Sequence, residues 1–221
     1  MMTKIISFSL WGNDKKYTFG ALKNADLASI IYPGWTCRFY IGKSVPSSII
    51  SDLIKKKNTE VYVMNEEGSW EGMFWRFWPA SDSNVEIMIS RDCDSRLSMR
   101  EKNAVDAWEK SDKMFHIMRD HPHHATQILG GMWGCKFPSI VNMKELINTY
   151  NKGDYWQVDQ NFLREKVYPL VKDTIMVHDE FFEKSPFPSP RDGLEFVGQV
   201  FNENEETVAE HLIPLQKYLE T

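Results

Sequence analysis

The first 64 residues alternate short apolar runs with amphipathic stretches, and this alternation constrains the fold more than any other feature. Apolar runs at Lys4–Leu10, Cys37–Ile41 and Glu60–Met64 predict strands. Between them, Tyr17–Ile31 and Pro46–Lys57 carry apolar residues at helical spacing, and the second of these begins with proline and ends in lysines. A strand–helix–strand–helix–strand order implies right-handed crossovers and a largely parallel sheet with helices on its faces.

The strand pattern continues at Val85–Ser90, which is nearly continuous in apolar character, as expected of an interior parallel strand. The remaining spacing predicts helices over 98–111, 139–150 and 159–168, strands over 114–118 and 174–177, a glycine-rich turn over 128–134, and a terminal helix from about 208. The chain has no internal repeat or long linker. We therefore expect an α/β protein with one domain over residues 1–221.

Composition removes several functional classes. Hydrophobic residues make up 42% of the 221 residues, enough for a sizeable core, and the net charge of −5 argues against a nucleic-acid partner. The cysteines Cys37, Cys93 and Cys135 form no C-x-x-C pair, which fits a reducing compartment rather than a disulfide framework or zinc module. No segment approaches the roughly 18 apolar residues of a membrane span, so we expect a soluble cytoplasmic protein.

Two aspartates, Asp92 and Asp94, follow the predicted strand Val85–Ser90 in the stretch SRDCDSR. In an extended or turned segment, side chains two residues apart point the same way, so both carboxylates can reach one Mg²⁺ or Mn²⁺ ion. Ligands of parallel sheets bind beyond the carboxyl ends of the strands, where this pair lies. The pattern also arises by chance, and an acidic loop capping the helix that begins near Ser98 is the alternative interpretation.

Three more residues are candidates for such a site. Arg76 lies in the aromatic run MFWRFWPASD, where stacking can hold a guanidinium toward a carboxylate or phosphate; the alternative is an amphipathic helix with the arginine reaching solvent. His178 follows the apolar run 174–177 and is either a third metal ligand or a hydrogen-bonded structural residue. Asp159 either faces an acceptor or caps a helix.

Two loops are candidate ligand contacts. Gly130 and Gly131 permit close backbone approach, and Trp133 offers an aromatic plate for a sugar ring; a tight turn with the tryptophan in the core is equally compatible. The run His121–His124 has the wrong spacing for a zinc site and predicts a polar loop that could line a site. The chain has no dinucleotide-binding, P-loop or G-x-S-x-G motif, which argues against those enzyme classes.

Taken in order, the segments KIISFSLWG, CRFYIGKSVPSSIISDL, FWRFWPASD and VEIMISRDCDSRL resemble the GT-A class of nucleotide-sugar glycosyltransferases. The later segments DQNFL and IMVHD are similar to the acceptor-side acidic position and the metal-binding histidine of retaining members. The nearest likeness is to the small chlorella-virus-type glycosyltransferase domain. The resemblance implies a single-domain, Rossmann-like GT-A fold whose mostly parallel, mixed sheet is flanked by helices. Residues 1–95 would form the nucleotide-binding half and 96–221 the acceptor-side half.

The resemblance also implies residue roles. The residues implied for nucleotide-sugar binding are Ser9, Leu10, Trp11, Arg76, Asp92, Cys93, Asp94, Gly131 and Trp133. The implied metal ligands are Asp92, Asp94 and His178, with Asp94 binding directly and Asp92 nearer the ribose or the metal's water shell. The implied catalytic residues are Asp159 and Arg76. The segment SPFPSPR stands where some relatives carry a Lys-Pro-Trp-like segment, which leaves the diphosphate contacts of this region unassigned.

The function implied by the resemblance is a metal-dependent hexosyltransferase. Its cofactor would be Mn²⁺ (or Mg²⁺), its donor a UDP-sugar and its acceptor a carbohydrate or glycoprotein, with retention of configuration favoured. A cytoplasmic location, the host cytoplasm for a viral chain, would follow. Two alternatives stay open. One is a sugar nucleotidyltransferase, for which SLWGNDKKY is a poor version of the usual glycine-rich basic loop. The other is a non-catalytic carbohydrate-binding protein on a transferase-like fold.

Overall fold

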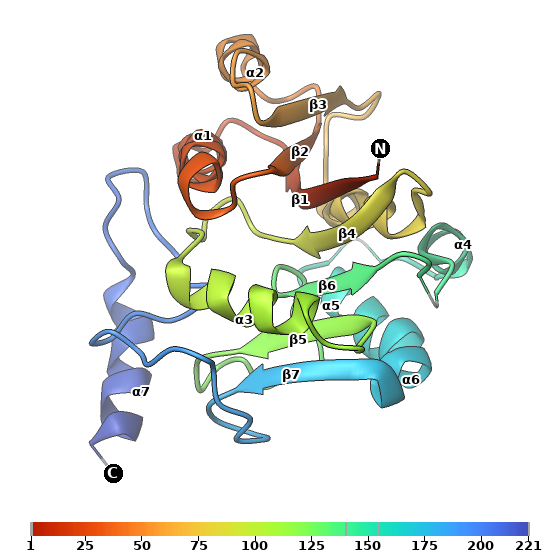
Figure 1. The fold of residues 1–221 in the computed structure, drawn as a ribbon. Coiled ribbons are helices and arrows are strands. Elements are labelled where there is room, and N and C mark those ends of the chain that lie inside the picture. Colours follow the sequence, from red (N-terminus) through yellow and green to blue (C-terminus); the bar gives the residue numbers. More distant parts are fainter. Residues whose placement is uncertain (1, 140, 154, 221) are drawn as a thin grey trace.

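A computed structural model describes residues 2–139, 141–153 and 155–220. Its strands are β1 (Thr3–Leu10), β2 (Trp35–Ile41), β3 (Thr59–Val63), β4 (Val85–Ser90), β5 (Phe115–Arg119), β6 (Trp133–Lys136) and β7 (Ile175–Asp179). They form one seven-stranded sheet in the order β3-β2-β1-β4-β6-β5-β7 (Figure 1). Among these strands only β6 runs antiparallel to its neighbours, so the predicted mostly parallel, mixed sheet is confirmed.

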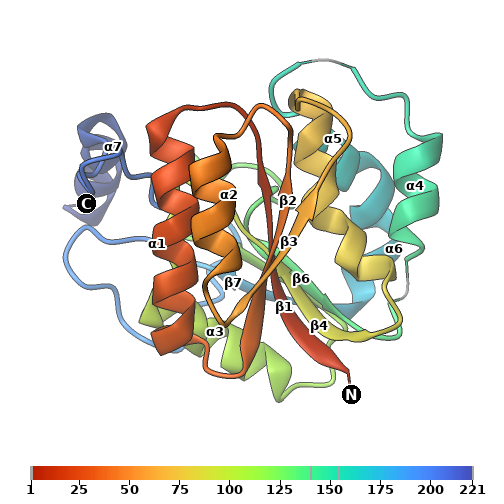
Figure 2. The same cartoon turned by 90° about the horizontal axis from the view of Figure 1, so that it is seen from above.

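Helices cover both faces of this sheet. They are α1 (Lys15–Ile31), α2 (Ser47–Ile54), the 3-10 helix η1 (Trp70–Ser81), α3 (Met99–Glu109), α4 (Met143–Thr149), α5 (Val158–Phe162), the π-turn η2 (Leu163–Val167), α6 (Tyr168–Val171), the short 3-10 turn η3 (Lys172–Thr174) and α7 (Ala209–Leu219). Figure 2 shows α1 and α2 on one face and the golden η1 with α4, α5 and α6 on the other. The described helices include none that is long and apolar enough to cross a membrane.

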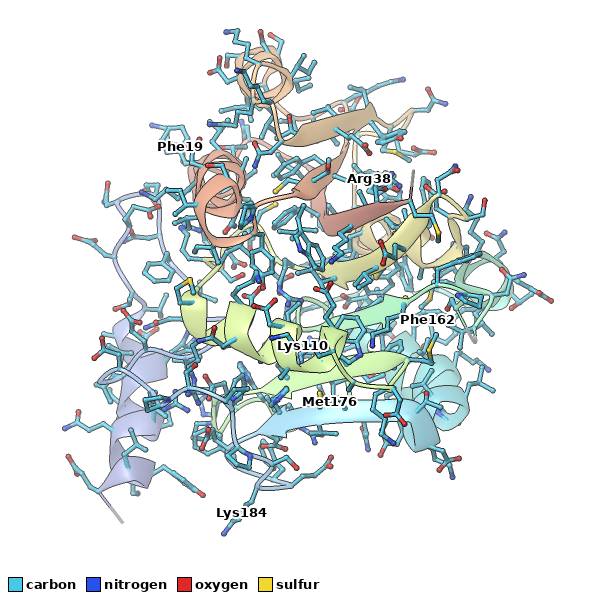
Figure 3. The ribbon with its side chains drawn as sticks, viewed as in Figure 1. Phe19, Arg38, Lys110, Phe162, Met176 and Lys184 are labelled. Carbon is cyan, nitrogen blue, oxygen red and sulfur yellow. The ribbon has the colours of Figure 1, made fainter. Side chains whose placement is uncertain are left out.

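Two apolar cores lie between these layers. The core under α1, α2 and α3 contains Ala25, Leu53 and Trp108, each fully buried. The core under η1 and α5 contains Phe77 and Phe162. In Figure 3 the buried Phe162 can be compared with Phe19 on α1, which is 42% exposed. The α/β layering predicted from hydrophobic periodicity is thus present on both faces.

Helix caps settle one alternative left open by the sequence. The helix after the SRDCDSR loop has Ser98 as its N-cap, and the Ser98 hydroxyl accepts a hydrogen bond from the Glu101 N–H at 3.2 Å. The capping side chain is therefore a serine and neither of the two aspartates. The side chains of Asp92 and Asp94 instead pair with Arg76 and Lys16.

Two segments differ from the prediction. The glycine-rich stretch 128–134 contains the predicted turn, but it ends in strand β6, which pairs with both β4 and β5. The helix expected to start at Asp159 starts at Val158, after Gln157 in a left-handed conformation with φ of 69°, so Asp159 is not the cap. Within the predicted helix 139–150 the structure has the shorter helix α4. Ile140, which the prediction included, lies outside the described residues.

The order of the strands creates a crevice beside β1. The chain adds β2 and then β3 on one side of β1, and it returns to add β4 on the other side. In sheets of this kind, such a reversal leaves an opening at the carboxyl ends of the two strands. Ser7 pairs with Ser90 in parallel register, so the segments that leave β1 and β4 begin side by side.

Candidate functional site

A cavity of about 670 Å³ lies at this switch point. Its walls come from the loop after β1, the start of α1, helix η1, the loops after β4 and β5, the turn before β6, the start of α5 and the C-terminal segment 196–211. The predicted site residues that line it are Ser9, Leu10, Trp11, Arg76, Asp92, Cys93, Asp94, Gly131 and Asp159. His178 and Trp133 do not line it.

A second, more open groove of about 730 Å³ lies over β2, β3 and η1. Its arginine, Arg38, is already neutralised by Glu60 and Asp82, each at 2.8 Å. This groove lies along the outer strands and is not lined by the Asp92–Asp94 pair, so it is a poorer candidate than the cavity at the strand ends.

Arg76 joins two of the predicted acids. Its guanidinium donates to Asp159 Oδ2 at 2.8 Å and to Asp92 Oδ1, and the side chain is 7% exposed. Its backbone N–H donates to the Ser9 hydroxyl at 3.0 Å, which ties η1 to the end of β1. The arginine is therefore held inside the cavity wall, and it does not reach solvent as an amphipathic helix would allow.

The glycine turn before β6 is pressed against these groups. A Cβ atom on Gly130 would lie 2.3 Å from Asp159 Oδ2, and one on Gly131 would lie 2.0 Å from Asp92 Oδ2. A side chain at either position would force the facing carboxylate to move. The backbone of this turn therefore lies against the two carboxylates, and its predicted approach to a ligand stays a prediction.

Burial perturbs the acids of this wall. It raises the pKa of Asp159, and the Arg76 charge opposes that shift. It also raises the pKa of Asp94, and the negative charge of Asp92 adds to the increase, while the Lys16 ammonium at 2.9 Å opposes it. Two carboxylates that repel each other in a cavity wall form a place where a bound cation is stabilised.

Asp92 and Asp94 fit a hard divalent cation as two oxygen donors. Asp92 uses Oδ1 for Arg76 and Asp94 uses Oδ2 for Lys16, so each has a second oxygen outside its ion pair. Across the described residues, no three side chains of the histidine, cysteine, aspartate or glutamate type gather into a metal-binding group. The other ligands would be water and substrate oxygens, the arrangement that Mg²⁺ commonly adopts.

His178 does not join this pair. It ends the predicted strand, but β7 lies three strand positions from β4, about 14 Å across the sheet at about 4.8 Å per strand. Its Nδ1 lies 2.8 Å from His116 Nε2, and burial lowers its pKa to about 4. The predicted strand before His178 is present. The order of the strands, however, places His178 too far from Asp92 and Asp94 for it to bind the same metal ion. His178 is instead a hydrogen-bonded structural residue.

Trp133 also requires a correction. It is fully buried, stacks on Phe115 with ring centroids 5.1 Å apart, and meets Phe77 edge-on at 5.2 Å. Pairing of β6 with its neighbours turns this side chain into the core. It therefore cannot act as a plate for a sugar in the cavity, and the core interpretation is correct.

A group of histidines, His121, His123, His124 and His211, lines the cavity and is called the histidine wall below. The Asp120 N–H donates to His124 Nδ1 at 3.0 Å, and His121 Nε2 lies 2.7 Å from the His211 carbonyl oxygen. Burial lowers the pKa of His124 to about 3, so its ring is neutral at pH 7. The sequence indicated the first three as a polar loop, but nothing in it indicated His211, which comes from α7.

Other lining residues had no sequence signal of their own. Trp156, 67% exposed, Gln157 and Gln160 precede or begin α5 and lie at the same cavity. Their closeness in sequence to Asp159 is the one feature that could have revealed them. Lys16, which pairs with Asp94, could be found only by matching helix α1 to the loop after β4.

No family model matches the chain, and no curated protein does. Solved structures do resemble it. A glycosyltransferase involved in glycosylation of the major capsid of PBCV-1 has 16% identity and a TM-score of 0.54, with 81% of this chain and 82% of that one covered. A glucosyl-3-phosphoglycerate synthase from Mycobacterium tuberculosis, solved with Mn²⁺, UDP and glucosyl-3-phosphoglycerate, has 12% identity and a TM-score of 0.53, with 80% and 70% covered.

A third similar structure is a 4-diphosphocytidyl-2C-methyl-D-erythritol synthase from Anaerococcus prevotii. It has 12% identity and a TM-score of 0.52, with 100% of this chain and 99% of that one covered. Identities this low establish the arrangement of strands and helices, and they say nothing of substrate. The chain has the GT-A-type α/β fold that these glycosyltransferases share.

Proposed function

We propose that the protein transfers a sugar from a nucleoside-diphosphate sugar, a UDP-sugar in the first instance, to a carbohydrate acceptor, with Mn²⁺ or Mg²⁺ as cofactor. The observation that carries this proposal is the Asp92–Asp94 pair in a cavity at the β1–β4 switch point. In the GT-A-type fold this is the opening beyond the strand ends, where ligands of open α/β sheets bind.

The proposal assigns a separate role in the reaction to each group of residues in the cavity. Ser9, Leu10 and Trp11, at the end of β1, frame the nucleotide. Arg76 holds Asp92 and Asp159 in fixed positions, which removes the cost of arranging them during the reaction. A divalent cation held by Asp92 and Asp94 would neutralise charge developing on the leaving diphosphate.

We assign the acceptor side to polar and aromatic groups. The histidine wall, Gln157 and Gln160 offer hydrogen bonds to hydroxyl groups, and the exposed Trp156 offers an apolar plate. Asp159 lies between this side and Asp92, bonded to the same arginine as Asp92. A carboxylate at the sugar is compatible with retention of configuration, which we include in the proposal.

Titration of UDP into the protein with and without Mn²⁺ tests the proposal. We expect Mn²⁺ to tighten UDP binding, and Asp94→Ala to weaken the Mn²⁺-dependent binding by about 100-fold, the equivalent of about 3 kcal/mol. Asp112→Ala, at an exposed position outside the cavity, is the matched control. UDP binding that is indifferent to Mn²⁺, or an unchanged Asp94→Ala, would remove the metal from the proposal.

A sugar nucleotidyltransferase is the second candidate, because the diphosphocytidyl synthase covers the whole of this chain. Such an enzyme releases pyrophosphate from a nucleoside triphosphate, whereas the glycosyltransferase releases a nucleoside diphosphate from a sugar nucleotide. Assays for the two products separate them. Glycan binding that needs neither nucleotide nor metal would favour the non-catalytic carbohydrate-binding alternative.

A further inference from the structure

Asp94 already has a cationic partner inside the protein. The Lys16 ammonium nitrogen lies 2.9 Å from Asp94 Oδ2, and the two side chains are only 30% and 15% exposed. A lysine ammonium is charged at neutral pH. Lys16 is therefore a cation held against Asp94.

Helix α1 fixes this lysine in place. Lys16 and Gly20 are four residues apart, so they share one face of the helix. A Cβ atom on Gly20 would lie 2.0 Å from the Cys93 carbonyl oxygen, which means that the helix backbone touches the loop after β4. One turn before this contact, the same face presents Lys16 to Asp94.

Asn24 extends the same face by one further turn. Its side-chain amide donates to the Ser95 carbonyl oxygen at 2.8 Å and accepts from the Leu97 N–H at 3.1 Å, both in buried surroundings. The stripe Lys16–Gly20–Asn24 thus follows the acidic loop along its length. The Lys16–Asp94 ion pair lies at one end of this stripe, so the packing of α1 against the loop holds the two side chains together.

We infer that Lys16 is an internal counter-ion that competes with a divalent cation for Asp94; this rests on the cation role proposed above. A metal could bind Asp94 through Oδ1, but it would then share one carboxylate with the Lys16 ammonium on Oδ2, and the two positive charges repel each other. This repulsion weakens the apparent affinity of the free protein for the metal.

The nucleotide changes this balance. Phosphate oxygens would add ligands for a metal, and their negative charge would offset the repulsion between the metal and the ammonium. Lys16 thereby makes cation binding depend on the nucleotide, and it neutralises Asp94 in the absence of a cation. Its role is that of a positioning residue at the binding site.

Titration of Mn²⁺ alone, without nucleotide, tests the inference. We expect Lys16→Met to bind Mn²⁺ about five- to tenfold more tightly than the unaltered protein. Lys16→Arg, which keeps the charge and can keep the pair, should stay close to the unaltered affinity. Lys15→Met is the matched control, because it removes the same charge at the neighbouring position. Lys15 is exposed, and among the described residues it has no ion-pair partner. Lys16→Gln serves as a second neutral variant should the methionine variant fold poorly.

The inference is overturned if both neutral Lys16 variants bind Mn²⁺ no more tightly than Lys15→Met, since the change would then reflect net charge alone. It is equally overturned if neither the unaltered protein nor these variants bind Mn²⁺. A separate titration of UDP at saturating Mn²⁺ judges the proposed function. UDP binding with an unchanged Mn²⁺ affinity in Lys16→Met would reject the inference and leave the glycosyltransferase proposal standing.

Discussion

Two walls of the same cavity differ in the chemistry of their side chains. The carboxylate wall, made of Arg76, Asp92, Asp94 and Asp159, is ionic, and its charges are matched by ion pairs that join separate segments. The histidine wall is polar and is held largely by hydrogen bonds to the backbone. Buried charges need partners, whereas buried neutral rings need only hydrogen bonds.

The difference separates two tasks within one cavity. An ionic wall suits phosphate groups and a cation, because fixed charges interact strongly where water is excluded. A polar wall held by hydrogen bonds suits hydroxyl groups, because it offers hydrogen-bond donors and acceptors. The comparison therefore predicts that substitutions in the two walls will differ in their effects on the free energy of unfolding and on its dependence on pH.

The largest expected effect is on the ionic wall. Arg76→Met leaves Asp159, 2% exposed, without its cation and should lower the free energy of unfolding by about 3–5 kcal/mol. Urea denaturation at pH 7 measures this loss. Arg38→Met is the control: Arg38 is equally buried, but its partners Glu60 and Asp82 are 37% and 29% exposed and can be hydrated. Equal losses of unfolding free energy in Arg76→Met and Arg38→Met would contradict the prediction that the carboxylate wall depends more strongly on its arginine.

The second effect concerns the histidine wall and pH. Burial lowers the pKa of His124 to about 3, so the folded protein holds the ring neutral while the unfolded chain protonates it below about 6.5. Stability from this group is present above pH 6.5 and is lost as pH falls toward 3, by about 2 kcal/mol between pH 7 and pH 5.

Urea denaturation of His124→Gln at these two pH values should therefore show a smaller acid-induced loss than the unaltered protein shows. His123→Gln, at an exposed position on the same loop, is the control and should keep the original loss. If His124→Gln keeps it as well, the acid sensitivity resides elsewhere in the fold.

The smallest effect on stability is expected at the cavity mouth. Trp156→Ala should change the free energy of unfolding by under about 0.5 kcal/mol, because the side chain is 67% exposed. It should still raise the KM for the acceptor about fivefold, through the loss of an apolar contact worth about 1 kcal/mol. Tyr155→Ala, which alters an exposed aromatic residue that does not line the cavity, is the comparison. A change in donor affinity would instead assign Trp156 to the other substrate.

The sequence was most informative where local pattern and burial agree. The apolar run at Val85–Ser90 predicts an interior strand by itself, and the position of Asp92 and Asp94 follows from where that strand ends. Arg76 could be selected because a guanidinium among aromatic residues is unusual. In each case the decisive information lies within about ten residues.

Failures arose where distant segments decide the outcome. His178 lies near the carboxyl end of a strand, but the order of strands places that strand at the sheet edge. Trp133 lies in a strand of four residues that forms only because β4 and β5 flank it, and this pairing sets the face to which the tryptophan points. The Arg76–Asp159 bond spans 83 residues of sequence, and no local pattern encodes it.

The C-terminal segment completes the cavity and is joined directly to the acidic loop. The Phe201 N–H donates to the Asp94 carbonyl oxygen at 2.9 Å, and Val200 forms an antiparallel bridge with Ser95. During synthesis, β1 to β4 leave the ribosome more than a hundred residues before this segment. A nascent chain can therefore form much of its sheet while the cavity is still open on one side. The cavity is complete only once this segment has been made, and a protease that cut between β7 and Phe196 would detach one wall of the cavity while leaving the strands of the sheet intact.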